Sequence, residues 1–164
     1  MKIRVLVLLI VLTIVPTISF CLTRTQKHNA STSPLVGVWR LSEIAPGSSN
    51  PQPGIYIFTD HYFSHDAVSS DTPRSLLARD RALTDREIAD AARGFLGSAG
   101  IYDVKGDQIT MRVIAALNPN YMLPEYSRVY SFRFVGRDTL WITETEAAGK
   151  PIPNPPMLKL TRLE

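Results

Sequence analysis

Gly37-Val38-Trp39 opens the first strand-like segment of this chain, and the last such segment, 157–163, carries Arg162 near its end. A planar guanidinium can stack on an indole face, which stabilises a protein by about 0.5–2 kcal/mol depending on how dry the site is. A tryptophan at the start and an arginine at the finish are what a closed barrel can use to plug one end. We therefore predict that Gly37, Trp39 and Arg162 form the floor of a barrel that encloses a cavity.

Eight short segments of strand character lie between residues 37 and 163, and most follow one another as hairpins. Tight turns join them at Asp60-His61, Lys105-Gly106-Asp107 and Gly136-Arg137-Asp138. Eight antiparallel strands in up-and-down order can close on themselves, which removes exposed edges and leaves an interior for side chains or one small ligand. The predicted fold class is thus all-β, an eight-stranded antiparallel up-and-down barrel. Its expected strands are 37–44, 55–59, 62–68, 99–104, 108–115, 127–135, 139–145 and 157–163.

One α-helix is expected between the third and fourth strands. Thr84-Asp85-Arg86-Glu87 has the pattern of a capping box, in which the threonine caps the first turn and the glutamate reaches back. An apolar face at helical spacing follows, and Gly94 and Gly97 are expected to end the helix. We expect this face to cover the mouth or the wall of the barrel. Its members are Ile88, Ala91, Ala92, Phe95 and Leu96.

The composition is that of an ordinary globular chain of 164 residues, with 45% hydrophobic and 20% charged residues. Residues 1–21 contain two basic and no acidic residues, so without them Lys+Arg falls from 18 to 16 against 15 Asp+Glu, a net charge of +1. A nearly neutral domain without a basic run gives no reason to expect nucleic acid. Metal-ligand spacing, a nucleophile motif and a phosphate-binding loop are all missing from the sequence, so we expect no metal, no cofactor and no catalytic residue.

The first residues have the pattern of a secretory signal peptide. Two basic residues precede a long aliphatic run, Pro16 breaks it, and small residues follow up to Cys21. We divide the chain into a signal peptide, 1–21, a polar tether, 22–34, and a barrel domain, 35–164. We therefore expect export, to the periplasm, the cell envelope or the outside. Membrane attachment is expected only through one of two alternatives: an uncleaved leader, whose apolar stretch is nearly long enough to span a bilayer, or lipidation of Cys21.

Several motifs, taken in order, resemble the bacterial lipocalin-like domains over about residues 35–164. The resemblance implies a calycin-type eight-stranded barrel and does not imply a single function. The chain departs from lipocalins proper, which usually place a helix after the last strands. The motifs are Gly37-Val38-Trp39-Arg40-Leu41, Gly54-Ile55-Tyr56-Ile57-Phe58-Thr59-Asp60, Gly100-Ile101-Tyr102-Asp103-Val104, Asn118-Pro119 and Arg128-Val129-Tyr130.

Alternation along the strands selects candidate ligand contacts, because every second side chain points inward. On 127–135, Tyr130, Phe132 and Phe134 form an apolar row, which places Arg128 inward at its end. Arg128 and the Tyr130 hydroxyl could then hold a carboxylate while the two phenylalanines line an apolar site. The alternative, favoured by the position of Arg128 near a strand end, places this arginine in water at the barrel rim. The other candidate ligand contacts are Tyr56, His65 and Tyr102.

A pair of carboxylates inside the barrel is a further alternative. If Trp39 points inward, Glu43 follows it on the same face, and Glu43 and Glu144 could face each other inside the barrel; we favour two rim residues instead.

Three functions remain open. The first is an exported barrel that binds a small apolar or amphipathic molecule. The second is an isomerase or cyclase that acts on a lipid-like substrate in the same cavity; fold analogy alone supports it, and the sequence leans against an enzyme. The third is a barrel filled by its own aromatic side chains, which serves as a structural or interaction module.

Overall fold

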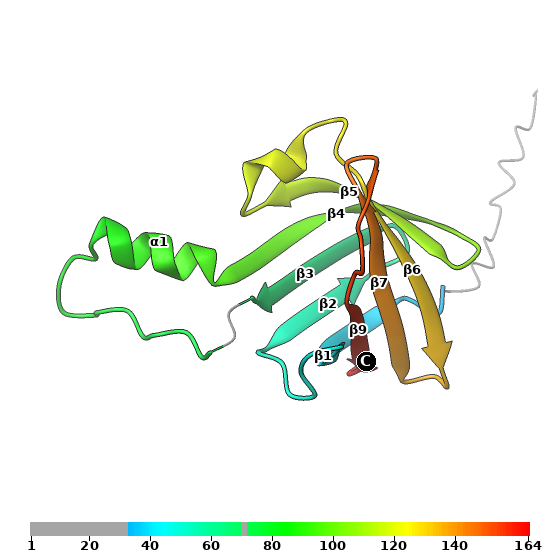
Figure 1. Cartoon of the computed structure of the whole chain (residues 1–164), viewed down its shortest axis with the longest axis horizontal. Helices are drawn as coiled ribbons and strands as arrows, with labels where there is room; N and C mark the ends of the chain where they lie inside the picture. The colour runs from blue at the N-terminus through cyan, green and yellow to red at the C-terminus, as the bar shows by residue number, and fades with distance from the viewer. Residues whose placement is uncertain (1–32, 70–71) are drawn as a thin grey trace, which may run out of the picture. The chain divides into compact units, whose positions relative to one another are not determined.

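A computed structural model describes residues 33–69 and 72–164 of the chain. These residues contain nine β-strands, one α-helix and one 3-10 helix (Figure 1). The leader, most of the tether and Cys21 lie outside these residues. The elements are β1 (Gly37–Ala45), β2 (Gly54–Phe58), β3 (Tyr62–Val68), α1 (Asp85–Arg93), β4 (Phe95–Lys105), β5 (Gln108–Ala116), η1 (Pro119–Met122), β6 (Arg128–Val135), β7 (Thr139–Ala147), β8 (Lys150–Pro151) and β9 (Met157–Arg162).

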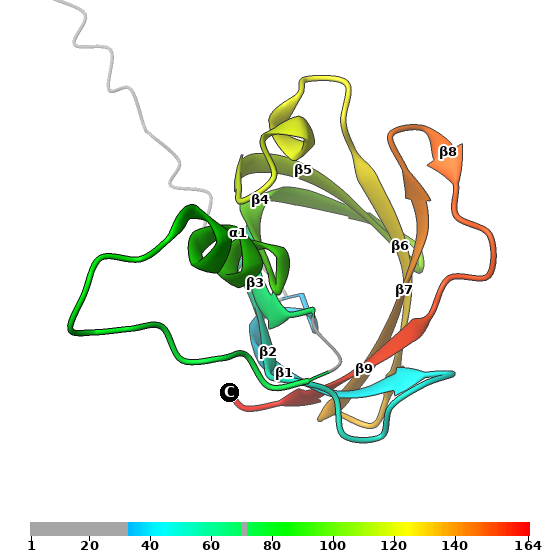
Figure 2. The ribbon, with the colours of Figure 1, turned by 60° about the vertical axis from the view of Figure 1, so that its left-hand side comes forward.

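Eight of the strands close into an antiparallel barrel. Each strand from β1 to β6 pairs with the next, β6 pairs with β7, β7 with β9, and β9 returns to β1. The remaining strand, β8, adds two residues to the end of β7 within the proline-rich connection 147–156. Figure 2 shows the ring of strands obliquely. The predicted eight-stranded antiparallel barrel, with one helix between its third and fourth strands, is confirmed.

The alternation of side chains explains why these segments form a barrel wall. In β2, Tyr56 and Phe58 are buried while Ile55 and Ile57 are exposed, and β3 repeats the pattern. Period-two burial requires extended backbone, because only a strand sends successive side chains to opposite faces. The inward rows form one apolar core, which consists of Leu35, Trp39, Leu41, Tyr56, Phe58, Phe63, Tyr102, Ile109, Met111, Tyr130, Leu140, Ile142 and Leu160.

Trp39 is fully buried in the end of the barrel that contains the start of β1. The guanidinium carbon of Arg162 lies 4.0 Å from the centre of the Trp39 ring, so the expected stacking is present. The indole nitrogen donates a hydrogen bond of 2.8 Å to the carbonyl of Leu35, and Phe134 packs against the indole with 6.0 Å between ring centres. Arg162 also donates to the carbonyls of four residues, Pro34, Val36, Arg137 and Glu164.

Gly37 is required at this end for a steric reason. Its φ of +143° is a conformation that residues with a Cβ rarely adopt. A Cβ there would also collide with the Arg162 guanidinium and with the backbone of Glu164. The glycine therefore lets the first strand pass close to the last one.

A β-bulge overturns the prediction that Glu43 points inward with Trp39. The register between β1 and β9 shifts between Leu41 and Glu43, so Leu41 faces Leu160 but Glu43 faces Lys159. The extra residue, Ser42, reverses the alternation. Glu43 lies 3.5 Å from the Lys159 ammonium on the outer side, and no inward pair of Glu43 with Glu144 forms.

The helix differs from its prediction in length and in packing. Thr84 and Glu87 form the expected capping box, but α1 ends at Arg93. Phe95 and Leu96 belong to β4, where they pair with the last residues of β3, because extended pairing there satisfies backbone groups that a continued helix would leave to water. What remains of the apolar face is short: no residue of α1 is buried, and Ile88 is 53% exposed. The helix extends away from the strands in Figure 1, and none of its side chains is buried against the barrel.

Near the end of β4, Tyr102 is buried and Val104 is exposed. Among the described residues, no helix is long and apolar enough to cross a membrane.

Candidate functional site

The strand β6 extends from one end of the barrel to the other. Its inward row begins at Arg128, continues through the buried Tyr130, and ends at Phe134 beside Trp39. Because Trp39 and Arg162 occupy one end, Arg128 marks the other. We refer to the Arg128 end as the mouth and to the Trp39 end as the floor.

Arg128 and Glu144 form an inward ion pair at the mouth. The arginine Nε lies 2.6 Å from Oε1 and its Nη2 lies 2.5 Å from Oε2, a bidentate arrangement. The two side chains are only 16% and 22% exposed, so the prediction that Arg128 lies in water at the rim is wrong. Burial opposes the charged form of Arg128, but hydrogen bonds to Glu144 and its charge hold the arginine pKa above its usual value. Arg128 is therefore a permanent cation whose partner is Glu144 rather than solvent.

His65 and Tyr56 form a stacked pair beside these charges. Their rings are 5.2 Å apart at an angle of 13°, and the His65 Nδ1 lies 3.3 Å from the hydroxyl of Ser98. Burial, assisted by the positive charge of Arg128, lowers the pKa of His65 to about 4. Burial also raises the pKa of Tyr56 to about 12 and that of Tyr130 well above its usual value. At neutral pH all three rings are therefore uncharged.

Three polar atoms in this cluster have no hydrogen-bond partner among the described residues. They are the hydroxyls of Tyr56 and Tyr130 and the Nε2 nitrogen of His65. Their side chains are buried, yet the described part of the chain contains no sealed side-chain nitrogen or oxygen without a partner. Each of these atoms must therefore be reached by solvent from within the barrel. Polar groups in such a position are available to a ligand.

A pocket of about 340 Å³ opens at the mouth. His65, Ser98 and Arg128 line its inner side, and residues from the start of β4, the end of α1 and η1 line the rest, including Tyr121. Tyr121 stacks on Tyr126 with 4.9 Å between ring centres, and the Arg128 guanidinium lies 5.7 Å from the Tyr121 ring. The mouth thus joins strands that are far apart in the sequence.

The six predicted ligand contacts divide into two groups. Arg128, Tyr130, Tyr56 and His65 come together at the mouth, since Tyr56 stacks on His65, Arg128 lies over the Tyr130 ring, and the charge of Arg128 acts on the pKa of the other three. Tyr102 lies apart, because its hydroxyl donates a bond of 2.6 Å to the carbonyl of Thr59 and its ring packs on that of Phe58. The sixth, Phe132, packs against Phe134 in the core, with 5.8 Å between ring centres.

Sequence reasoning missed Ser98, Tyr121 and Tyr126 as neighbours of this site. Asn118-Pro119 carried a signal for the tyrosines, because an asparagine cap followed by proline is typical of a helical turn, and this turn, η1, positions Tyr121. The sequence held no signal for Ser98, because the inward direction of its side chain depends on where β4 begins.

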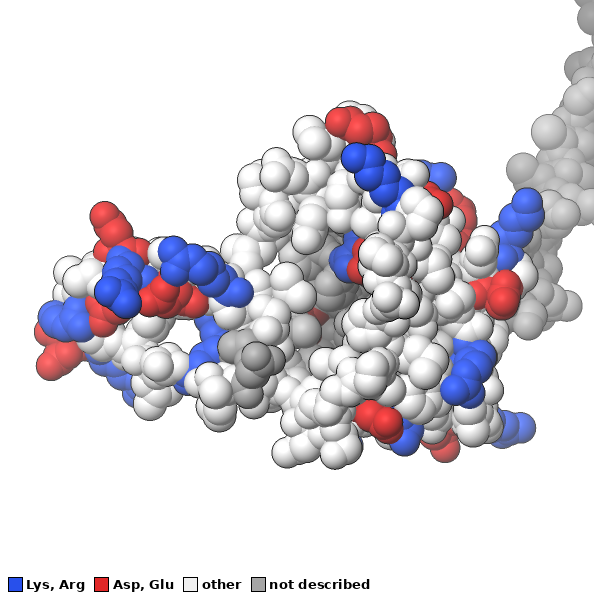
Figure 3. All heavy atoms as spheres, in the orientation of Figure 1, with Lys and Arg blue, Asp and Glu red and all other residues white. Residues whose placement is uncertain are grey.

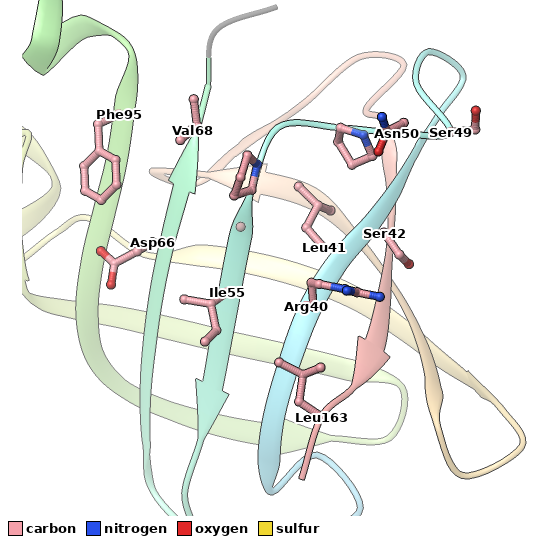
Figure 4. A pocket seen from close by; sticks show the side chains of 13 residues that line it. Arg40, Leu41, Ser42, Ser49, Asn50, Ile55, Asp66, Val68, Phe95 and Leu163 are labelled. Carbon is pink, nitrogen blue, oxygen red and sulfur yellow. The ribbon is translucent and has the colours of Figure 1, made fainter. Parts of the chain in front are cut away.

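A second, wider pocket of about 690 Å³ lies mainly on the outside of the barrel (Figure 4). Arg40, Ile55 and Asp66 contribute to it, and each is next to an inward-facing residue in its own strand, so each points outward. It is separate from the polar cluster at the mouth. Positive and negative side chains are interspersed around α1 on the face shown in Figure 3, where no extended patch of one sign appears.

The fold and the cluster at the mouth define a small closed barrel with a polar opening. A family model for the lipocalin-like domain matches residues 36–151, and the chain therefore belongs to the lipocalin-like domain family, whose barrels serve small-molecule binding in general. A search of solved structures finds a lipocalin-like protein from Bacteroides uniformis ATCC 8492, with 17% identity, 79% of this chain and 99% of that chain covered, and a TM-score of 0.42. No curated protein matches the chain.

Proposed function

We propose that the barrel binds one small apolar or amphipathic molecule through its mouth. The observation that supports this most directly is the set of polar atoms at Tyr56, Tyr130 and His65 that have no partner among the described residues and are open to solvent. A ligand that displaces this water without replacing its hydrogen bonds would leave each group unpaired, at a cost of about 1–3 kcal/mol. A ligand that hydrogen-bonds to these atoms avoids this cost.

The size of the ligand is limited by the packing of the floor. The lower barrel is filled by large side chains, among them Trp39, Ile109, Leu140 and Leu160, which are fully buried. The pocket of about 340 Å³ at the mouth is at the small end of the range for ligand sites. We expect one compact ligand rather than a long lipid lying through the whole barrel.

Binding of N-phenyl-1-naphthylamine, an uncharged dye that fluoresces in apolar surroundings, tests the proposal. We expect saturable binding of one dye per chain. Ser98→Leu, which fills the mouth pocket, is expected to abolish binding, and the matched Ser42→Leu, which fills the outer pocket, is expected to leave it unchanged. Circular dichroism confirms that both variants fold. No saturable binding, or loss with Ser42→Leu alone, would contradict the proposal.

A second candidate is an isomerase or cyclase that acts on a bound lipid-like substrate. It is favoured by the hydrogen-bonded Ser98 and His65 in the mouth pocket, where an uncharged imidazole could accept a proton. Turnover of an unsaturated lipid that is lost in His65→Gln supports this candidate over simple binding. The third candidate, a barrel that serves as a structural or interaction module, is favoured by the filled floor. Purification from its own host without a co-purifying mass, together with no dye binding, would support it.

We also propose that the protein is exported, because residues 1–21 have the pattern of a signal peptide. Intact-mass spectrometry of the protein from its host tests this. A mass that begins near residue 22 supports cleavage, an added acyl mass on Cys21 supports lipidation, and the full-length mass supports an uncleaved leader.

A further inference from the structure

The charges at the mouth are already neutralised within the chain. Glu144 occupies the Nε and Nη2 edge of Arg128, one of the two edges by which a guanidinium holds a carboxylate in bidentate fashion. The other cation that lines the pocket, Arg93, is paired with Asp90 at 2.5 Å. Neither arginine therefore offers an uncompensated positive charge to a ligand.

The polar atoms that remain available are hydrogen-bond donors. The hydroxyls of Tyr56 and Tyr130 keep their protons at neutral pH, because burial raises both pKa values. We assign the proton of the His65 ring to Nε2, because Nδ1 is the nitrogen within reach of the Ser98 hydroxyl. Arg128 adds its Nη1, for which no partner is found among the described residues. His65 and Arg128 line the mouth pocket, Tyr56 stacks on His65, and the Arg128 guanidinium lies over the Tyr130 ring. Several donors thus lie in or directly beside a pocket whose charges are paired.

An ionised carboxylate would meet two costs in this site. It would lose part of its hydration shell on entering the mouth pocket. It would also approach the carboxylate of Glu144, with only one arginine to balance two negative charges. A ketone, ester or amide oxygen accepts the same hydrogen bonds without either cost.

We infer that the ligand presents an uncharged carbonyl oxygen to Tyr56, Tyr130 and His65, and that Glu144 excludes free carboxylic acids from the mouth. This inference rests on the proposed function and specifies its ligand class. Glu144 is then a specificity-determining residue that acts through Arg128. It turns an arginine suited to carboxylates into part of a neutral pair.

Two probes of nearly equal shape test the inference: 2-nonanone and octanoate, which differ only in a methyl group against an ionised oxygen. Titration calorimetry with the purified full-length chain at pH 7 gives both affinities. We expect 2-nonanone to bind roughly tenfold more tightly than octanoate, because only octanoate loses hydration of a charge and approaches the Glu144 carboxylate. Equal affinity, or tighter binding of octanoate, would overturn the inference while leaving the proposed function intact. Binding of neither probe would overturn both.

Glu144→Gln tests the role of the carboxylate. Freed from its partner, Arg128 should bind octanoate roughly tenfold more tightly than before, while 2-nonanone should change less than about threefold. Glu43→Gln is the matched control, since it removes a carboxylate paired with Lys159 on the outer side. If Glu144→Gln does not fold, the double variant Arg128→Gln/Glu144→Gln removes both charges and should still prefer 2-nonanone. An unchanged preference in Glu144→Gln, or loss of that preference in the double variant, would overturn the inference.

Discussion

Replacing Arg162 by alanine should destabilise the barrel far more than removing an arginine from its outer face. The guanidinium lies 4.0 Å from the centre of the buried Trp39 ring, a contact that contributes about 1–2 kcal/mol in a dry site. Arg162 also donates to backbone carbonyls, including that of Val36 at 2.8 Å. Because Arg162 is partly exposed, water can replace some of these bonds, and we count only about 1.5 kcal/mol for them together.

The expected loss in the free energy of unfolding is therefore about 3 kcal/mol, or roughly 10 °C in Tm for a domain of this size. Thermal and urea unfolding, followed by circular dichroism, measure both quantities. Arg162→Lys keeps the charge but not the planar fork, and should lose about half as much.

Arg133→Ala is the matched control for this prediction. Arg133 lies 5.2 Å from the centre of the Trp141 ring on the outer face, so it makes the same kind of contact in water. Its removal should cost no more than about 0.5 kcal/mol. If Arg162→Ala falls within about 0.5 kcal/mol of this control, the stacking at the floor contributes nothing special and the reasoning is refuted.

Two other substitutions test the wall and the mouth. Gly100→Ala should lower the free energy of unfolding in urea by about 3 kcal/mol, because the new Cβ would collide with the backbone oxygen of Arg112 at the bulge between β4 and β5. In the control Gly106→Ala the Cβ meets nothing within 4 Å, so only about 1 kcal/mol should be lost, for the φ of +62°. Equal losses in the two variants would contradict the close approach of the backbones at Gly100. His65 gives the stability a pH dependence: its pKa of about 4 in the folded state lies below the unfolded value of 6.5, so the unfolded chain binds more protons between these values and stability falls as pH drops from about 6.5 to 4. The full effect is about 3 kcal/mol, and we expect His65→Gln to remove it and His61→Gln to retain it; a slope unchanged in His65→Gln would disprove this origin.

The sequence by itself determined the closed barrel, because that prediction depended on features that act locally. Turn residues such as Gly106 and Gly136, both with positive φ, set the hairpins. Alternation along each strand then selected the inward rows, and the row through Tyr130 and Phe134 was predicted correctly.

Only the tertiary structure decided which way side chains point after a β-bulge and which residue pairs with each inward charge. One extra residue at Ser42 turned Glu43 outward, and its presence depends on how β1 meets β9, which no local pattern records. Phe95 and Leu96 joined a strand instead of the helix because β3 was there to pair with them. Arg128 was expected to meet either water or a ligand, and it meets Glu144, 16 residues away in the sequence. Which charges pair inside a closed barrel depends on the register of neighbouring strands, and the sequence carries that register only through contacts made after the barrel has closed.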